Sequence, residues 1–207
     1  MAYLYNPQAI EARSYELIAA ELGDCRLTAG EKAVLFRIIH ATGDLSYARL
    51  ISFHPEFITA AVAALKRGAG IFTDIEMVRA GISSRLVDSL GGKIFCAIRE
   101  PEVAAEAKIK NVTRAMAAME WLARRMDGGL VVIGNAPTAL FRLLELMEAE
   151  VARPAAVIGV PVGFVGAAEA KEALAVTSIP HVVVRGTKGG SPVAVAAVNA
   201  LLKLAVE

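Results

Sequence analysis

The chain has 207 residues, which suits one large domain or two small ones, and no change in composition marks a boundary. Its 22 basic and 21 acidic residues give a net charge of +1, without the basic excess of a nucleic-acid-binding surface. Although 56% of the residues are hydrophobic, no unbroken apolar stretch approaches the roughly 20 residues that cross a bilayer, so we expect one cytoplasmic domain (1–207) that binds neither nucleic acid nor membrane.

Three helices are predicted in the N-terminal third of the chain. Pro7–Gly23 has apolar residues at helical spacing, a proline in its first turn and a glycine as its stop signal. Thr28 and Glu31 form a T-x-x-E capping box before a second helix, whose last turn holds His40. Residues 54–68 are expected to form the third helix, opened by the His-Pro pair at its start.

From residue 70 onward, short β-branched runs alternate with helical segments. The predicted strands are Ile71–Asp74, Lys93–Ile98, Leu130–Gly134, Ala155–Val160 and His181–Gly186. The predicted helices are 102–125, 137–149, 167–175 and 192–204. Strand runs that are apolar on both faces and separated by helices indicate a parallel sheet covered on both sides. We therefore predict a three-layer α/β fold, with a mainly parallel five-stranded sheet and extra N-terminal helices.

The unusual residues of the C-terminal two thirds fall where predicted strands end. In sheets of this kind, ligands bind outside the carboxyl ends of the strands. The residues concerned are Asp74, Asn135, 159–165 and 187–191. This clustering predicts a binding site at that edge, independently of any family.

Asn135 can cap a helix that has Pro137 in its first turn, which would leave backbone N–H groups facing the strand end. Such a turn can cradle an anion, but it is also an ordinary β-to-α connection. It is not a dinucleotide fingerprint, and the chain contains no P-loop motif.

Two glycine-bearing segments follow the last two predicted strands. GVPVGFVGAAEAKE (159–172) suits close approach of the backbone to a flat ligand, with Phe164 and Val165 against its face, or else is a tight crossover. GTKGGS (186–191) offers Lys188 and Ser191 at a helix N-terminus, where carboxylates can bind, or else is a solvated turn.

Histidine has an ordinary pKa of about 6.5 and suits proton transfer near neutral pH. Of the three histidines, His54 resembles a helix-start residue and His181 begins a strand, where packing is expected. His40 lies just before a predicted turn, although its position alone leaves a structural role open. Cys25 and Cys96 lack CxxC spacing, so neither predicts a metal or redox site.

Taken together, these segments resemble the precorrin-8X/cobalt-precorrin-8 methylmutase family along nearly the whole chain. The segments, in the family's order, are NPQAIEARSY, RIIHATGD, FTDIEMVRAGI, TRAMAAME, GNAPTALFRLLE, GVPVGFVGAAEAKEAL and KGGSPVAVAAVNALL. The resemblance implies an isomerase of cobalamin biosynthesis that needs no cofactor. It would move a methyl group between adjacent ring carbons, converting cobalt-precorrin-8 to cobyrinate or precorrin-8X to hydrogenobyrinate.

The resemblance also implies a homodimer with its active sites at the subunit interface. Any cobalt would belong to the corrinoid substrate and product, so no metal ligand is expected in the protein. The N-terminal segment and the end of the chain look more like the members that handle the cobalt form.

By position in its motif, His40 matches the family's catalytic histidine, and we expect it to act as a general acid on a ring nitrogen. Asp44 would orient the imidazole only if the helix continued through Gly43. Because the substrate carries many carboxylates, a local basic rim is expected. The predicted substrate-binding residues are Arg13, Ser14, Thr73, Asp74, Arg114, Asn135, Thr138, Gly163, Phe164, Val165, Arg185, Lys188, Gly189 and Ser191.

Two other functions are consistent with such a chain. A non-catalytic tetrapyrrole carrier would keep the pocket and the basic rim but would have no use for His40. A nucleotide-dependent α/β enzyme would share the sheet, but the missing phosphate loop argues against it.

Overall fold

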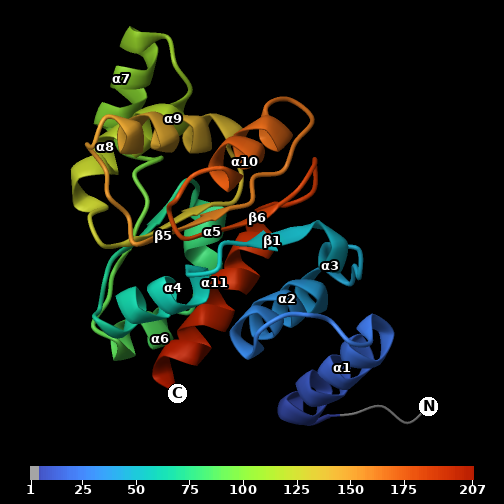
Figure 1. Cartoon of the computed structure of the whole chain (residues 1–207). Coiled ribbons are helices and arrows are strands. Elements are labelled where there is room, and N and C mark those ends of the chain that lie inside the picture. The colour runs from blue at the N-terminus through green and yellow to red at the C-terminus, as the bar shows by residue number, and fades with distance from the viewer. Residues whose placement is uncertain (1–4) are drawn as a thin grey trace.

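A six-stranded sheet forms the middle layer of the computed structural model, which describes residues 5–207 (Figure 1). The strands are β1 (Ile51–Phe53), β2 (Ile71–Thr73), β3 (Ile94–Phe95), β4 (Leu130–Ile133), β5 (Ala156–Gly159) and β6 (His181–Val184). Their order is β1-β6-β5-β4-β2-β3, with β1 antiparallel to β6 and every other pair parallel. The α/β class and the mainly parallel sheet are thus confirmed, but the number of strands was wrong. The additional strand is β1, which pairs Ile51 with Val184 at the sheet edge.

Helices cover both faces of the sheet (Figure 1). One face carries α2 (Ala29–Thr42), α4 (Phe57–Lys66), α5 (Glu76–Gly81), α6 (Ser84–Ser89) and α11 (Ser191–Val206). The other carries α7 (Pro101–Lys110), α8 (Arg114–Leu122), α9 (Pro137–Glu148) and α10 (Ala167–Ala175). Outside the first face, α1 (Pro7–Leu22) lies beside α2, and the short α3 (Tyr47–Leu50) leads into β1.

The buried strands explain why helices are needed on both faces. Leu130 and Val132 of β4 pack into the core on the α11 side, whereas Val131 and Ile133 pack into the core on the α9 side. All four side chains are completely buried. Burying each such side chain contributes roughly 1.5–3 kcal/mol to the free energy of folding. Because the side chains of one strand alternate between the two faces of the sheet, this burial requires a helical layer on each face.

The helix signals near the N-terminus were mostly correct. Thr28 and Glu31 form the predicted capping box at the start of α2, and Gly23 ends α1. The third helix begins at Phe57 rather than at residue 54. The helix predicted over 102–125 is broken, because Asn111 adopts a left-handed conformation (φ 53°) after α7 and a new helix follows.

The sheet topology brings the loops that follow the parallel strands to one edge. Parallel strands end at the same edge, and the antiparallel β1 starts there because Ile51 pairs with Val184 at the end of β6. The segment between His40 and Leu50 therefore arrives at the edge where the β4, β5 and β6 loops lie. The chain order also reverses between β2 and β4, which is where open α/β sheets usually bind ligands.

Within residues 5–207, no helix combines the length and the apolar character that crossing a membrane requires.

His181 makes folding stability sensitive to pH. It is buried at the start of β6, its Nδ1 lies 2.7 Å from the Ile179 carbonyl oxygen, and its ring centroid lies 5.4 Å from that of His54. Burial lowers the pKa of His181 below its ordinary value. As the pH falls through the ordinary pKa of histidine, His181 becomes protonated in the unfolded state but stays neutral in the folded state. The free energy of unfolding therefore decreases as the pH falls below that value.

We expect the free energy of unfolding in urea to decrease between pH 7.5 and pH 5.5, and this decrease to be smaller in His181→Asn. Asparagine can place an N–H near the position of Nδ1 but does not titrate. An equal pH dependence in both proteins would contradict this assignment.

Candidate active site

His40 lies in the last turn of α2 and faces a cavity between α1 and α2. The helix ends at Thr42, because Gly43 adopts the left-handed conformation (φ 65°). The cavity has a volume of about 300 Å³ and is lined by Ser14, Leu17, Ile18, Glu21, Ile39, His40, Gly43 and Leu45. Ser14, Leu17, Ile18 and Glu21 recur at helical spacing and therefore form one face of α1. The same spacing is visible in the sequence and pointed to Leu17, Ile18 and Glu21, which were not predicted as site residues.

Asp44 does not orient His40. The helix stops before it, and its carboxylate instead accepts hydrogen bonds from the Lys188 ammonium and the Ser46 backbone N–H. The Lys188 contact is the main cause that lowers the pKa of Asp44 to about 2. Lys188 also donates to Ser46 Oγ at 2.7 Å. Lys188, predicted to bind a substrate carboxylate, thus already has a carboxylate partner and fastens the β6–α11 loop to the chain just after His40.

Thr73 and Asp74 point into the protein, contrary to the expected contact with the ring periphery. Asp74 is 1% exposed. Its carboxylate oxygens accept hydrogen bonds from the backbone N–H groups of Gly134, Asn135 and Ala136, with N–O distances of 2.8–3.0 Å. Burial raises the pKa of Asp74, against the opposing effect of these donors. Thr73 is completely buried and donates to the Phe95 carbonyl.

The same contacts correct the prediction for the β4–α9 turn. The N-cap of α9 is Ala136, and the Asn135 side chain makes no capping hydrogen bond. The backbone N–H groups that the sequence suggested as an anion cradle already bind a carboxylate, that of Asp74. The crevice at the chain reversal between β2 and β4 is therefore bridged by the protein itself.

Other predicted residues meet where α8 and α9 begin. Thr138, in the first turn of α9, shares a hydrogen bond of 2.9 Å with Thr113, the N-cap of α8. Arg114 follows directly and is exposed, as is Asn135 before α9. The structure thus brings Arg114, Asn135 and Thr138 to one part of the carboxyl edge.

The β5–α10 and β6–α11 loops are joined to each other. Gly163 N–H donates to the Thr187 carbonyl at 3.1 Å, and Gly190 N–H donates to the Val160 carbonyl at 2.8 Å. At Gly189 (φ 151°), a Cβ would lie 2.3 Å from the Val160 oxygen, so only glycine fits. This glycine serves loop packing, whichever ligand binds.

The tip of the β5–α10 loop presents two apolar side chains to solvent. Phe164 is 93% exposed and Val165 is 89% exposed. Ser191, by contrast, is buried in the first turn of α11. Two further predicted cations are exposed: Arg185 follows β6, and Arg13 forms an ion pair of 2.9 Å with Glu16 on α1. Of the predicted residues, only Ser14 shares the cavity of His40.

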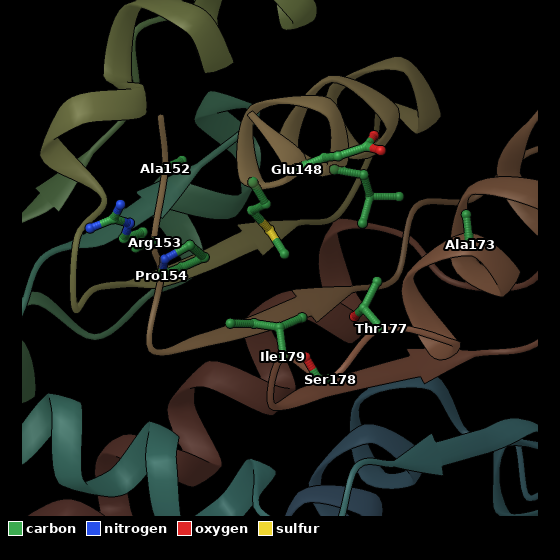
Figure 2. A pocket seen from close by; sticks show the side chains of 10 residues that line it. Glu148, Ala152, Arg153, Pro154, Ala173, Thr177, Ser178 and Ile179 are labelled. Atoms are coloured by element: carbon green, nitrogen blue, oxygen red, sulfur yellow. The ribbon is translucent and has the colours of Figure 1, made fainter. Parts of the chain in front are cut away.

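A larger hollow of about 600 Å³ lies between α9 and α10 (Figure 2). Met147, Arg153 and Ile179 are among its lining residues, together with Thr177 and Ser178. These residues lie beside the amino ends of β5 and β6, at the edge opposite to the predicted site. None of the predicted site residues lines it, so its size alone does not make it the active site.

Comparison with known proteins identifies the family. The family model described as precorrin-8X methylmutase matches residues 9–204. The chain belongs to the precorrin-8X methylmutase family. This methylmutase is accordingly an isomerase of cobalamin biosynthesis, which moves a methyl group within one molecule.

Three relatives illustrate the match. The methylmutase is 51% identical to the cobalt-precorrin-8 methylmutase of Methanothermobacter thermautotrophicus, with 91% of this chain and 87% of the relative covered. It is 42% identical to the precorrin-8X methylmutase of Sinorhizobium sp., with 97% and 96% covered. The crystal structure of the Thermus thermophilus precorrin-8X methylmutase superimposes with a TM-score of 0.89 at 39% identity, covering 96% of each chain.

Proposed function

We propose that this methylmutase converts cobalt-precorrin-8 to cobyrinate and that His40 is its general acid. The observation that carries the proposal is the imidazole itself, which faces the cavity between α1 and α2. Among residues 5–207, it has an aromatic neighbour, Tyr15, but no hydrogen-bond or ion-pair partner. Both of its ring nitrogens are therefore available to a ligand.

The chemistry suits an acid at this position. As the methyl group migrates, one C–CH₃ bond breaks while another forms on the adjacent ring carbon, and the ring double bonds shift without gain or loss of atoms. An imidazolium that lends its proton to the conjugated ring draws electron density from the carbon that accepts the methyl group and takes the proton back once the group has moved. In the metal-free form a ring nitrogen can accept this proton, whereas in the cobalt form the nitrogens hold the metal and the acceptor has to be another atom of the conjugated system. Positioned acid catalysis typically contributes about 10²- to 10⁴-fold, or roughly 3–5 kcal/mol of the barrier.

Because the rearrangement is internal, it requires no redox partner or methyl donor, and we propose that no cofactor takes part. Cobalt enters and leaves as part of the corrinoid. Support for the cobalt form comes from the N-terminal segment and from the relative that is 51% identical and named for it. The exposed Arg13, Arg114 and Arg185 are proposed to bind the carboxylate arms of the ring, where charge-assisted hydrogen bonds are strong.

We further propose that a second copy of the chain completes each active site. The His40 cavity, at about 300 Å³, is at the lower limit of small-molecule sites and is small for a ring built from four pyrrole units. Its rim carries exposed apolar side chains, Leu17 and Leu45. Light scattering is expected to give twice the 21.8 kDa mass of one chain. A monomer mass at the concentration of the activity assay would contradict a shared site.

Filling the cavity tests where the substrate binds. Leu17 lines it and is half exposed, so Leu17→Trp is expected to leave folding intact while occupying the space. We expect KM to rise by about tenfold or more, because the indole ring takes the space of the substrate. A tenfold rise corresponds to a loss of about 1.4 kcal/mol in binding free energy. Ile109→Trp, at an exposed site on α7, is the matched control. An unchanged KM in Leu17→Trp would place the substrate elsewhere.

A further inference from the structure

Helix α1 is held to the protein by few buried side chains and by one carboxylate. Of its sixteen residues, only Ile18 is buried. Glu11 accepts hydrogen bonds from Lys203 Nζ at 2.9 and 3.1 Å, and from Arg37 Nη1 at 3.1 Å. Lys203 belongs to α11 and Arg37 to α2, so this carboxylate joins three helices.

The same carboxylate also holds an aromatic ring beside His40. Tyr15 Oη donates to Glu11 Oε1 at 3.2 Å, one turn along α1. The centroid of the Tyr15 ring lies 5.8 Å from that of His40, with the two planes at 86°. On its other side, Tyr15 packs edge-on against Phe36, with centroids 6.0 Å apart. The Tyr15 ring is therefore fixed by Glu11 and Phe36 and in turn contacts the imidazole.

We propose that Glu11 and Tyr15 are positioning residues that hold the His40 imidazole toward the cavity, a role that rests on His40 being the general acid. Since no hydrogen bond from residues 5–207 orients the imidazole, packing against Tyr15 has to set its direction. The residues that form the α1 wall of the cavity lie on the same helix, so Glu11 also places that wall.

The charges around Glu11 agree with a fixed, ionised carboxylate. The hydrogen bond from Lys203 is the main cause that lowers the pKa of Glu11 below its ordinary value. The ion pairs with Arg37 and Lys203 are nevertheless partly exposed, and pairs of that kind add little to stability. The consequence of losing Glu11 is therefore expected in catalysis more than in folding.

The experiment compares kcat with the NMR signal of the His40 ring protons at constant pH. Tyr15→Leu removes the ring, so we expect the His40 signal to shift and kcat to fall by about 10- to 100-fold, as for other misplaced catalytic groups. Tyr15→Phe keeps the ring but loses its anchor, so the signal should stay closer to wild type and the loss should be smaller. Glu145→Ala, which removes an exposed carboxylate from α9, is the control for Glu11→Ala.

A double variant tests the link between the two residues. Since Tyr15→Phe and Glu11→Ala remove the same hydrogen bond, the double variant should lose no more kcat than Glu11→Ala alone. Independent, additive losses would overturn the link. This pair retains both the ring and the helix, so it decides the question even if Tyr15→Leu fails to fold.

The inference is also overturned if Tyr15→Leu folds and keeps both the His40 signal and a kcat within about twofold of wild type. In that case His40→Ala would still be inactive, and the proposed function would stand. Full activity of His40→Ala would instead overturn the proposed function, whatever the Tyr15 variants do.

Discussion

Replacing His40 by alanine is expected to lower kcat by about 10²- to 10⁴-fold, because the proton donor to the conjugated ring is lost. Substrate binding should weaken by less than about tenfold, since affinity comes mainly from the ring contacts and the cations at the carboxyl edge. His40 is half-buried at the end of α2, beside an open cavity, so the variant should remain folded. Single-turnover rates and equilibrium titration with substrate measure the two effects separately.

His54→Ala is the matched control, because this histidine lies at the far end of β1, near the amino end of β6, and contacts His181. Its kcat is expected to stay near that of wild type. Equal turnover in His40→Ala and wild type would refute the acid role. A tetrapyrrole carrier would instead bind the corrinoid in both the wild type and His40→Ala, and neither protein would turn it over.

Replacing Asp74 by alanine is expected to destabilise the protein by about 3 kcal/mol or more. Three backbone N–H groups, of Gly134, Asn135 and Ala136, would lose their acceptor, and each unsatisfied donor costs roughly 1–3 kcal/mol. Water reaching the partly open turn limits the loss. Asp74→Asn, which keeps one oxygen, should be milder. Urea unfolding at neutral pH measures the difference in the free energy of unfolding.

Asp88→Ala provides the comparison, since this carboxylate is exposed on α6 and its removal should change stability by less than about 0.5 kcal/mol. Because Asp74 is buried and holds the β4–α9 turn, we predict a role for it in the fold and not in substrate binding. A normal stability together with a raised KM in Asp74→Ala would reverse that assignment and restore the contact expected from the sequence.

The fold was predictable where a segment carries its own signal. Helix α10 has the predicted bounds, Ala167–Ala175, and the capping box before α2 is present. The strand β1 was not predicted, because three residues give no periodicity and the partner, β6, is far away in the sequence. The break at Asn111 was also missed, since the residues on either side of it favour helix.

The edge of the sheet at which the strand-end residues lie was predictable, but the directions and partners of their side chains were not. The edge of the sheet follows from the parallel strands, so residues after strand ends were correctly expected to gather there. Side-chain direction does not follow, and Asp74 turned inward to bind the β4–α9 turn. Partners distant in the sequence could not be paired from spacing: Asp44 and Lys188 are 144 residues apart, and Glu11 and Lys203 are 192 apart.

The most direct test of the proposed function is incubation of the purified protein with cobalt-precorrin-8 and, separately, with precorrin-8X, while visible spectra are recorded. Moving the methyl group changes which ring carbon is saturated and therefore changes the conjugation of the ring. The reaction is thus detected as a shift in the visible absorption spectrum. We expect a shift with the cobalt form that is lost in His40→Ala. No shift with either substrate, in a protein that binds both, would contradict the methyl migration proposed for this enzyme.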